Sequence, residues 1–146
     1  MPRRLSSLHA RAIRHATEDG SRVEEALRTV VGDAPITRSA SQGHFGNQLE
    51  VLESVLEDEA RILSVLGRMD SGDRTVIAST LEARTDSSCH VFMRLDKQRA
   101  YKGELRLSDG DDVIAVRVKV RAFPAKPEVA MRVMRDVLEG LSGESD

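Results

Sequence analysis

The stretch that decides the fold runs Asp112-Val113-Ile114-Ala115-Val116-Arg117-Val118-Lys119-Val120-Arg121-Ala122. Its side chains alternate in kind along the sequence. The aliphatic residues at positions 114, 116, 118 and 120 alternate with Ala115, Arg117, Lys119 and Arg121. Only an extended strand directs alternate side chains to opposite faces in this way. We therefore expect a β-strand with one aliphatic face for the core. Its other face carries three cations about 7 Å apart, which is two residues of strand rise.

This cationic face has two interpretations. Like charges held on a rigid strand repel one another, and at a spacing close to that of successive phosphates they invite a polyanionic partner. The alternative is an ordinary solvated strand face. The choice depends on whether other segments bring cations to the same side of the sheet.

The composition indicates a soluble globular domain. The chain has 146 residues, of which 40% are hydrophobic and 32% are charged, with a net charge of -2. We expect one domain over residues 5–141 and a disordered acidic tail over residues 142–146. No apolar run approaches the roughly 20 residues of a membrane span, and the N-terminus lacks the apolar segment of a signal peptide. These features predict a cytoplasmic protein with no membrane contact.

The charge is unevenly distributed. Residues 1–17 hold four Arg and no acid, and residues 89–126 hold nine Lys and Arg against five Asp and Glu. Acidic residues therefore dominate the remainder, notably between Glu50 and Glu59. The nearly neutral total thus conceals two basic segments.

The apolar periodicity predicts the element order β-α-β-β-α-α-β-β-α. Strands are expected over 8–16, 36–41, 49–56, 88–95 and 112–122. Helices are expected before Gly32, over 57–69, after Asp73 and from Pro127, and residues 97–107 are expected to form a polar connector. This order indicates a two-layer α+β fold, with an antiparallel or mixed sheet and helices on one face.

By parity, the open face of such a sheet collects imidazoles, cations and one aromatic ring. Its expected members are His9, Arg11, His15, His90, Phe92, Arg94, Arg117, Lys119 and Arg121. This composition is typical of a nucleic-acid platform.

Three segments also resemble a known family. They are His-Ala-Thr-Glu-Asp at 15–19, Gly-His-Phe-Gly-Asn at 43–47 and Asp-Lys-Gln-Arg-Ala-Tyr-Lys-Gly-Glu-Leu at 96–105. In this order, followed by Val116 to Pro124 and a closing helix, they resemble an archaeal family described as RNA-binding and predicted to be an exosome subunit. The resemblance covers roughly residues 5–140. The resemblance implies an α+β domain of the kind seen in ribosomal large-subunit protein five. It also implies a cytoplasmic location and association with RNA processing, with exosome or ribosome-related proteins as partners.

The expected RNA-binding residues come from both lines of reasoning. They are Arg11, His15, His44, Phe92, Arg94, Lys97, Arg99, Tyr101, Lys102, Arg117, Lys119 and Arg121. In the connector, Lys97 and Arg99 neutralise phosphates while Tyr101 stacks on a base, or else Tyr101 anchors a solvated segment to the core. Phe92 either stacks on a base or is covered by a loop. The turn at 43–47 either binds phosphate through its amides and His44 or is a plain hairpin.

Catalysis is not expected. The acidic residues between Glu50 and Glu59 scatter over strand and helix faces, so no acid-base pair or Mg²⁺ site emerges. Cys89 falls on the side of its expected strand that faces the core, which favours a buried thiol over a nucleophile. As the only cysteine it excludes an intramolecular disulfide, and we expect no metal or cofactor. The leading hypothesis is a non-catalytic RNA-binding protein. The alternative is an assembly subunit or homodimer that uses the same face, and a hydrolase is the least favoured.

Overall fold

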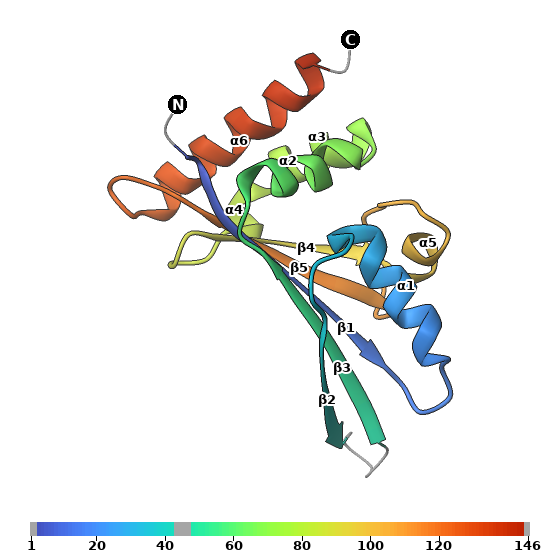
Figure 1. The fold of residues 1–146 in the computed structure, drawn as a ribbon. Coiled ribbons are helices and arrows are strands. Elements are labelled where there is room, and N and C mark those ends of the chain that lie inside the picture. The colour runs from blue at the N-terminus through green and yellow to red at the C-terminus, as the bar shows by residue number, and fades with distance from the viewer. Residues whose placement is uncertain (1–2, 43–47, 145–146) are drawn as a thin grey trace. The chain divides into compact units, whose positions relative to one another are not determined.

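The structure, a computed structural model, describes residues 3–42 and 48–144 (Figure 1). The elements, in chain order, are β1 (Leu5–Arg14), α1 (Gly20–Val31), β2 (Thr37–Gln42), β3 (Gln48–Leu56), α2 (Glu59–Arg68), α3 (Ser71–Ser79), α4 (Leu81–Arg84), β4 (His90–Asp96), α5 (Lys97–Tyr101), β5 (Val113–Val120) and α6 (Pro127–Glu144). This order confirms the α+β class and adds two short helices to the predicted elements.

The strands form one five-stranded sheet in the order β2-β3-β1-β5-β4. Within it, β2 and β3 are antiparallel neighbours in which Thr37 lies opposite Glu53. Burial alternates along β5 as the sequence predicts: Ile114, Val116, Val118 and Val120 are buried, whereas Ala115, Arg117 and Arg121 are exposed. One side of the strand therefore belongs to the core and the other faces solvent.

The described residues divide into two compact units. Unit 1 contains residues 3–8, 56–93 and 117–144, and unit 2 contains residues 9–42, 48–55 and 94–116. The expectation of one domain over 5–141 stays a prediction.

In unit 1, helix α6 packs against α2, α3 and α4. Aliphatic side chains from all four helices are fully buried with those of the β4 and β5 segments, among them Ile62, Leu66, Ile77, Leu81, Met134, Leu138, Val91 and Val118. The helix starts are fixed by aspartates. Asp58 caps α2 by accepting a hydrogen bond from the Ala60 N–H, and Asp70 caps α3 by accepting one from the Gly72 N–H. We expected Asp73 as the second cap, so α3 begins earlier than predicted.

In unit 2, helix α1 packs against α5. Asp19 caps α1 through the Ser21 N–H, and Val23, Ala26, Leu27 and Val30 form the buried stripe. Gly32 ends the helix with φ +63°, a left-handed conformation that glycine adopts without a steric penalty.

The structure corrects the predicted ends of some elements. The first strand spans Leu5–Arg14 rather than residues 8–16, so His15 lies beyond it. Lys97–Tyr101 form a helix where we expected an irregular connector, because Asp96 caps them by accepting from the Arg99 N–H. The turn at 43–47 lies outside the described residues.

Candidate nucleic-acid interface

The strongest candidate surface is in unit 1, on the exposed side of β5. Arg117, Lys119 and Arg121 follow one another on this side, and we call them the basic strand face. Val118 and Val120 point into the core between them, which fixes the direction of the three cations. Lys119 is half-buried, and its ammonium donates a hydrogen bond to the Ser88 carbonyl.

Strand β4 places an aromatic ring beside this face. The Val120 N–H donates to the Cys89 carbonyl at 2.9 Å, and the Lys97 N–H donates to the Asp112 carbonyl at 3.2 Å. Both bonds fit one antiparallel register, in which Phe92 lies opposite Arg117 and His90 lies opposite Lys119. Phe92 is 43% exposed, and its ring centroid is 6.2 Å from that of His90. No loop buries Phe92, so one of its two expected roles is excluded.

Among residues 3–42 and 48–144, the basic strand face has no acidic counterions. Among the residues that the structure describes, no carboxylate lies within 4.0 Å of the charged nitrogens of Arg117, Lys119 or Arg121. Opposite charges this close are the usual way for a protein to neutralise surface cations. The three positive charges are therefore available to an anionic partner.

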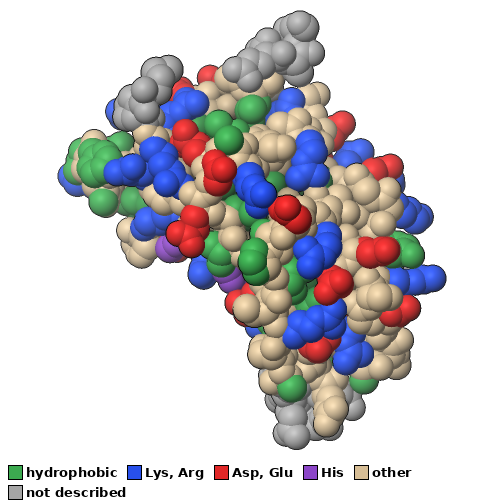
Figure 2. Space-filling view, viewed as in Figure 1, with side chains coloured by type: hydrophobic (Ala, Val, Ile, Leu, Met, Phe, Trp, Pro, Cys, Tyr) green, Lys and Arg blue, Asp and Glu red, His purple; other side chains and the backbone are tan. Residues whose placement is uncertain are grey.

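Most cations of unit 2 are paired with carboxylates. Arg11, Arg14, Arg38, Lys97 and Arg99 each lie within 4.0 Å of one. Figure 2 shows the same mixing over α1, where Lys and Arg side chains alternate with Asp and Glu side chains. This surface is close to neutral locally, so it attracts polyanions less than the basic strand face does.

Two predicted residues of β1 illustrate this pairing. Glu53 on β3 accepts from His9 at 3.0 Å and lies 3.8 Å from Arg11.

Arg94 on β4 is exposed and makes only a long contact, 3.5 Å, to the Gly110 carbonyl. His15 is exposed beyond the end of β1. Of these cations, Arg94 keeps the most available charge.

The structure contradicts the expected role of Lys97. This side chain is only 3% exposed, and its ammonium contacts the Ile13 carbonyl at 2.9 Å, Glu18 at 2.9 Å and Asp112 at 2.7 Å. An ammonium has three donors, and all three are used. The Lys97 charge therefore stabilises the interior of unit 2 and is not available to a phosphate.

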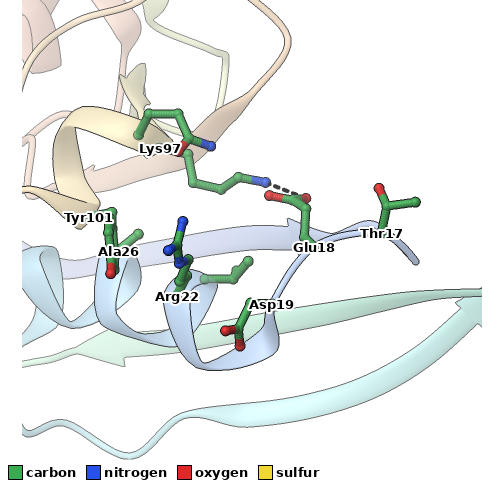
Figure 3. Close-up of a pocket in the computed structure, with 9 residues that line it drawn as sticks. Thr17, Glu18, Asp19, Arg22, Ala26, Lys97 and Tyr101 are labelled. Carbon is green, nitrogen blue, oxygen red and sulfur yellow. Dashed lines mark hydrogen bonds and ion pairs between the residues drawn. The ribbon is translucent and has the colours of Figure 1, made fainter.

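The ion pair of Lys97 lies at the wall of a pocket between the start of α1 and α5 (Figure 3). The pocket holds about 330 Å³, and Arg22, Gln98 and Tyr101 also line it. The Arg22 guanidinium lies 5.2 Å from the centroid of the Tyr101 ring. The pocket thus brings together the segments 15–19 and 96–105, which are far apart in the sequence.

The Asp112 carboxyl is one of the two acidic partners of Lys97, and its charge depends on its surroundings. Burial by itself raises the pKa of the Asp112 carboxyl, but the hydrogen bonds from Gln98 and Lys97 outweigh burial and hold the pKa below its usual value. The carboxylate is therefore charged at neutral pH, as an ion pair with Lys97 requires.

Three of the remaining predicted residues are at least partly exposed, at α5 or immediately after it. Arg99 is exposed and pairs with Glu104 at 3.0 Å, and Lys102 is exposed at the end of α5 with no carboxylate near it in the described chain. Tyr101 is partly exposed beneath Arg22 rather than anchored in the core. His44 lies outside the described residues.

One exposed aromatic residue beside the basic strand face was not among the residues predicted from the sequence. Phe123 is 78% exposed, more than any other large hydrophobic residue described, and the Arg121 guanidinium lies 5.7 Å from its ring centroid. The signal was present in the sequence, since Phe123 continues the parity of Arg117, Lys119 and Arg121 by one further step.

Two negative observations concern the described residues only. They contain no group of three or more His, Cys, Asp or Glu side chains arranged to hold a metal ion. None of their helices is both long and apolar enough to cross a membrane.

A basic strand whose cations have no carboxylate partner in the described chain is typical of proteins that bind polyanions. Comparison with known families identifies the class more closely. Residues 7–120 match the model of a family described as RNA binding, and the chain belongs to this family.

Individual relatives agree with that assignment. Over 144 residues, covering 92% of this chain and 94% of the relative, the sequence is 35% identical to RNA-binding protein PAB1135 of Pyrococcus abyssi. It is 30% identical over 133 residues to the uncharacterised protein MJ0213 of Methanocaldococcus jannaschii, covering 84% of this chain and 89% of that protein. Among solved structures, Mth689 of Methanothermobacter thermautotrophicus, a DUF54 protein, superposes with a TM-score of 0.83 and 31% identity, over 93% of this chain and 99% of that one. The family part of the resemblance is confirmed, and the exosome association stays a prediction.

Proposed function

We propose that this protein binds RNA without catalysis, by contacts between phosphates and the basic strand face. The observation that carries the proposal is that no carboxylate of the described chain lies near Arg117, Lys119 or Arg121, in contrast to the paired cations of unit 2. A rigid row of unpaired cations attracts polyanions and releases their counterions on binding. The family description and the name of the Pyrococcus abyssi relative support RNA as the polyanion.

Electrostatics is expected to dominate this binding, because the chain has only three Phe, one Tyr and no Trp. Each phosphate contact contributes about 0.7 to the salt slope for a single strand. Three contacts give a slope of about 2 from the basic strand face alone. Between 50 and 200 mM salt, the affinity should fall about 20-fold through these residues.

The test replaces Arg117, Lys119 and Arg121 together with Ala and measures RNA binding by fluorescence anisotropy at several salt concentrations. The matched control replaces Arg61, Arg132 and Arg135, three exposed arginines on α2 and α6 of the same unit. We expect the strand-face variant to lose about two units of salt slope and the control to keep its slope. Equal losses in the two variants would show that only net charge matters and would refute the proposed interface.

The predicted protein partners and the assembly alternative are tested by separate measurements. Association with the exosome or another RNA-processing complex is tested by co-sedimentation of the purified proteins after ribonuclease treatment. A dimer or protein complex that is insensitive to salt and that Arg117→Ala disrupts would favour the assembly alternative. Light scattering with and without RNA distinguishes these cases.

A further inference from the structure

The alternation of β5 does not stop where the strand ends. Beyond Val120, Arg121 is exposed, Ala122 is buried and Phe123 is exposed. Side chains two residues apart in extended chain point to the same side. Phe123 lies in a bend beyond the strand, and its ring centroid is 5.7 Å from the Arg121 guanidinium, so the ring lies next to the last cation of the basic strand face.

The chain around Phe123 is held in place on both sides. Before it, the Arg121 N–H donates to the Arg4 carbonyl at 2.8 Å, and Ala122 is buried in unit 1. After it, the Lys126 N–H donates to the Pro124 carbonyl at 2.8 Å, immediately before α6. Figure 2 shows hydrophobic side chains beside Lys and Arg side chains where Figure 1 draws this connection, at the left. The ring is thus presented to solvent by an anchored segment.

A single exposed phenylalanine is ordinary on protein surfaces. Two features set Phe123 apart. The Arg121 guanidinium lies 5.7 Å from the ring centroid, yet 78% of the residue is still exposed, so ring surface is left for a second planar group. The ring also ends a row of cations that no carboxylate of the described chain neutralises. Cations that track a backbone, combined with an aromatic platform, are the means by which proteins hold single-stranded nucleic acid.

We propose that Phe123 stacks on an unpaired RNA base while Arg121 and Lys119 contact the neighbouring phosphates. This inference rests on the proposed function and deepens it, because it names single-stranded RNA as the substrate class. Bases within a duplex are stacked on one another and present only their edges, so an aromatic ring reaches the face of a base only where the strand is unpaired.

Fluorescence tests the stacking directly. The chain has no Trp, so Phe123→Trp introduces a unique fluorophore at the proposed platform. Val76→Trp is the matched control, because Val76 is also exposed and lies on α3 of the same unit. Titration with a single-stranded oligonucleotide should quench the fluorescence at position 123 and leave that at position 76 nearly unchanged. Absence of quenching at 123, or equal quenching at both positions, would overturn the inference.

Affinity measurements separate this inference from the proposed function. Phe123→Ala should weaken single-strand binding about 5- to 140-fold, the range for one stacked base, without changing the salt slope. Duplex RNA should bind the wild type and this variant equally. Phe123→Tyr should restore binding and Phe123→Leu should not. If Phe123→Ala has no effect while the strand-face variant loses binding, stacking fails and the proposed function stands. Rescue by Leu as complete as by Tyr would indicate a plain apolar contact and would equally overturn stacking.

Discussion

Replacing Lys97 with Met should destabilise the protein more than any surface substitution. The methionine retains much of the apolar stem but removes an ammonium that contacts Glu18, Asp112 and the Ile13 carbonyl. Breaking a buried ion pair from one side costs about 3–5 kcal/mol, because the remaining charge is left without compensation. The two carboxylate side chains are 24% and 47% exposed, so water offsets part of this cost. We therefore expect a loss of about 2–3 kcal/mol.

Urea unfolding at pH 7, followed by circular dichroism, measures this loss. With a slope of about 1–3 kcal/mol/M, the midpoint should fall by roughly 1–2 M. Lys102→Met is the control, since Lys102 is an exposed lysine immediately after the same helix and its replacement should change stability by less than about 0.5 kcal/mol. Lys97→Met combined with Glu18→Gln and Asp112→Asn should recover much of the loss, because no unpaired charge then remains.

The stabilisation that Asp112 provides depends on pH in a definite direction. Hydrogen bonds from Gln98 and Lys97 hold the pKa of Asp112 below its usual value against the opposing effect of burial. The stability from this group is therefore present above the ordinary pKa of an aspartate and is lost as the pH falls through the lowered value. Wild type and Lys97→Met should converge in stability in strong acid. Identical urea midpoints at pH 7 would refute the reasoning.

Three further predictions concern stability and are tested by thermal unfolding. Hydrogen bonds from two N–H groups at the start of β1 lower the pKa of Glu59, and their stabilisation is lost as the pH falls through that lowered value. Glu59→Gln should therefore flatten the acid side of the curve of stability against pH. Parallel curves for the wild type and the variant from pH 7 to 3 would contradict this. Gly32→Ala should cost about 1 kcal/mol, because φ +63° strains any residue with a side chain, and an unchanged melting temperature would argue against this strain. Arg74→Met should cost about 1.5–3 kcal/mol, since the buried guanidinium donates to the Met69 carbonyl at 2.6 Å beyond the end of α2, whereas a loss below about 0.5 kcal/mol would show that water replaces the bond.

Periodicity alone predicted the elements whose burial is decided locally. Alternation in β4 and β5 needs only that one side of each strand faces the core, and both strands have the predicted buried and exposed faces. The same holds for α1, whose apolar stripe and terminal glycine are confirmed. The exposure of Phe92 followed from the same parity argument.

Pairing of charges could not be predicted in this way. Residues 97–102 resemble a solvated connector, because nothing nearby in sequence indicates that Lys97 is buried. Its partner Glu18 lies 79 residues away, and only the packing of α1 against α5 brings the two together. The pairing of Arg11 with Glu53 depends in the same way on strands from distant parts of the chain. Whether a cation is available to a ligand is thus decided by tertiary structure.

This difference bears on where an RNA-binding site should be sought. The segments 15–19 and 96–105 carried the resemblance to the family, yet Glu18 and Lys97 from these segments hold unit 2 together. The three cations of the basic strand face have no carboxylate near them in the described chain, and they lie outside these two segments. We therefore expect Arg99→Ala to reduce RNA affinity less than Arg117→Ala, although both remove one exposed guanidinium, because Arg99 already has Glu104 at 3.0 Å. The reverse order in a salt titration would place RNA on unit 2 and would show that the family motifs themselves form the binding site.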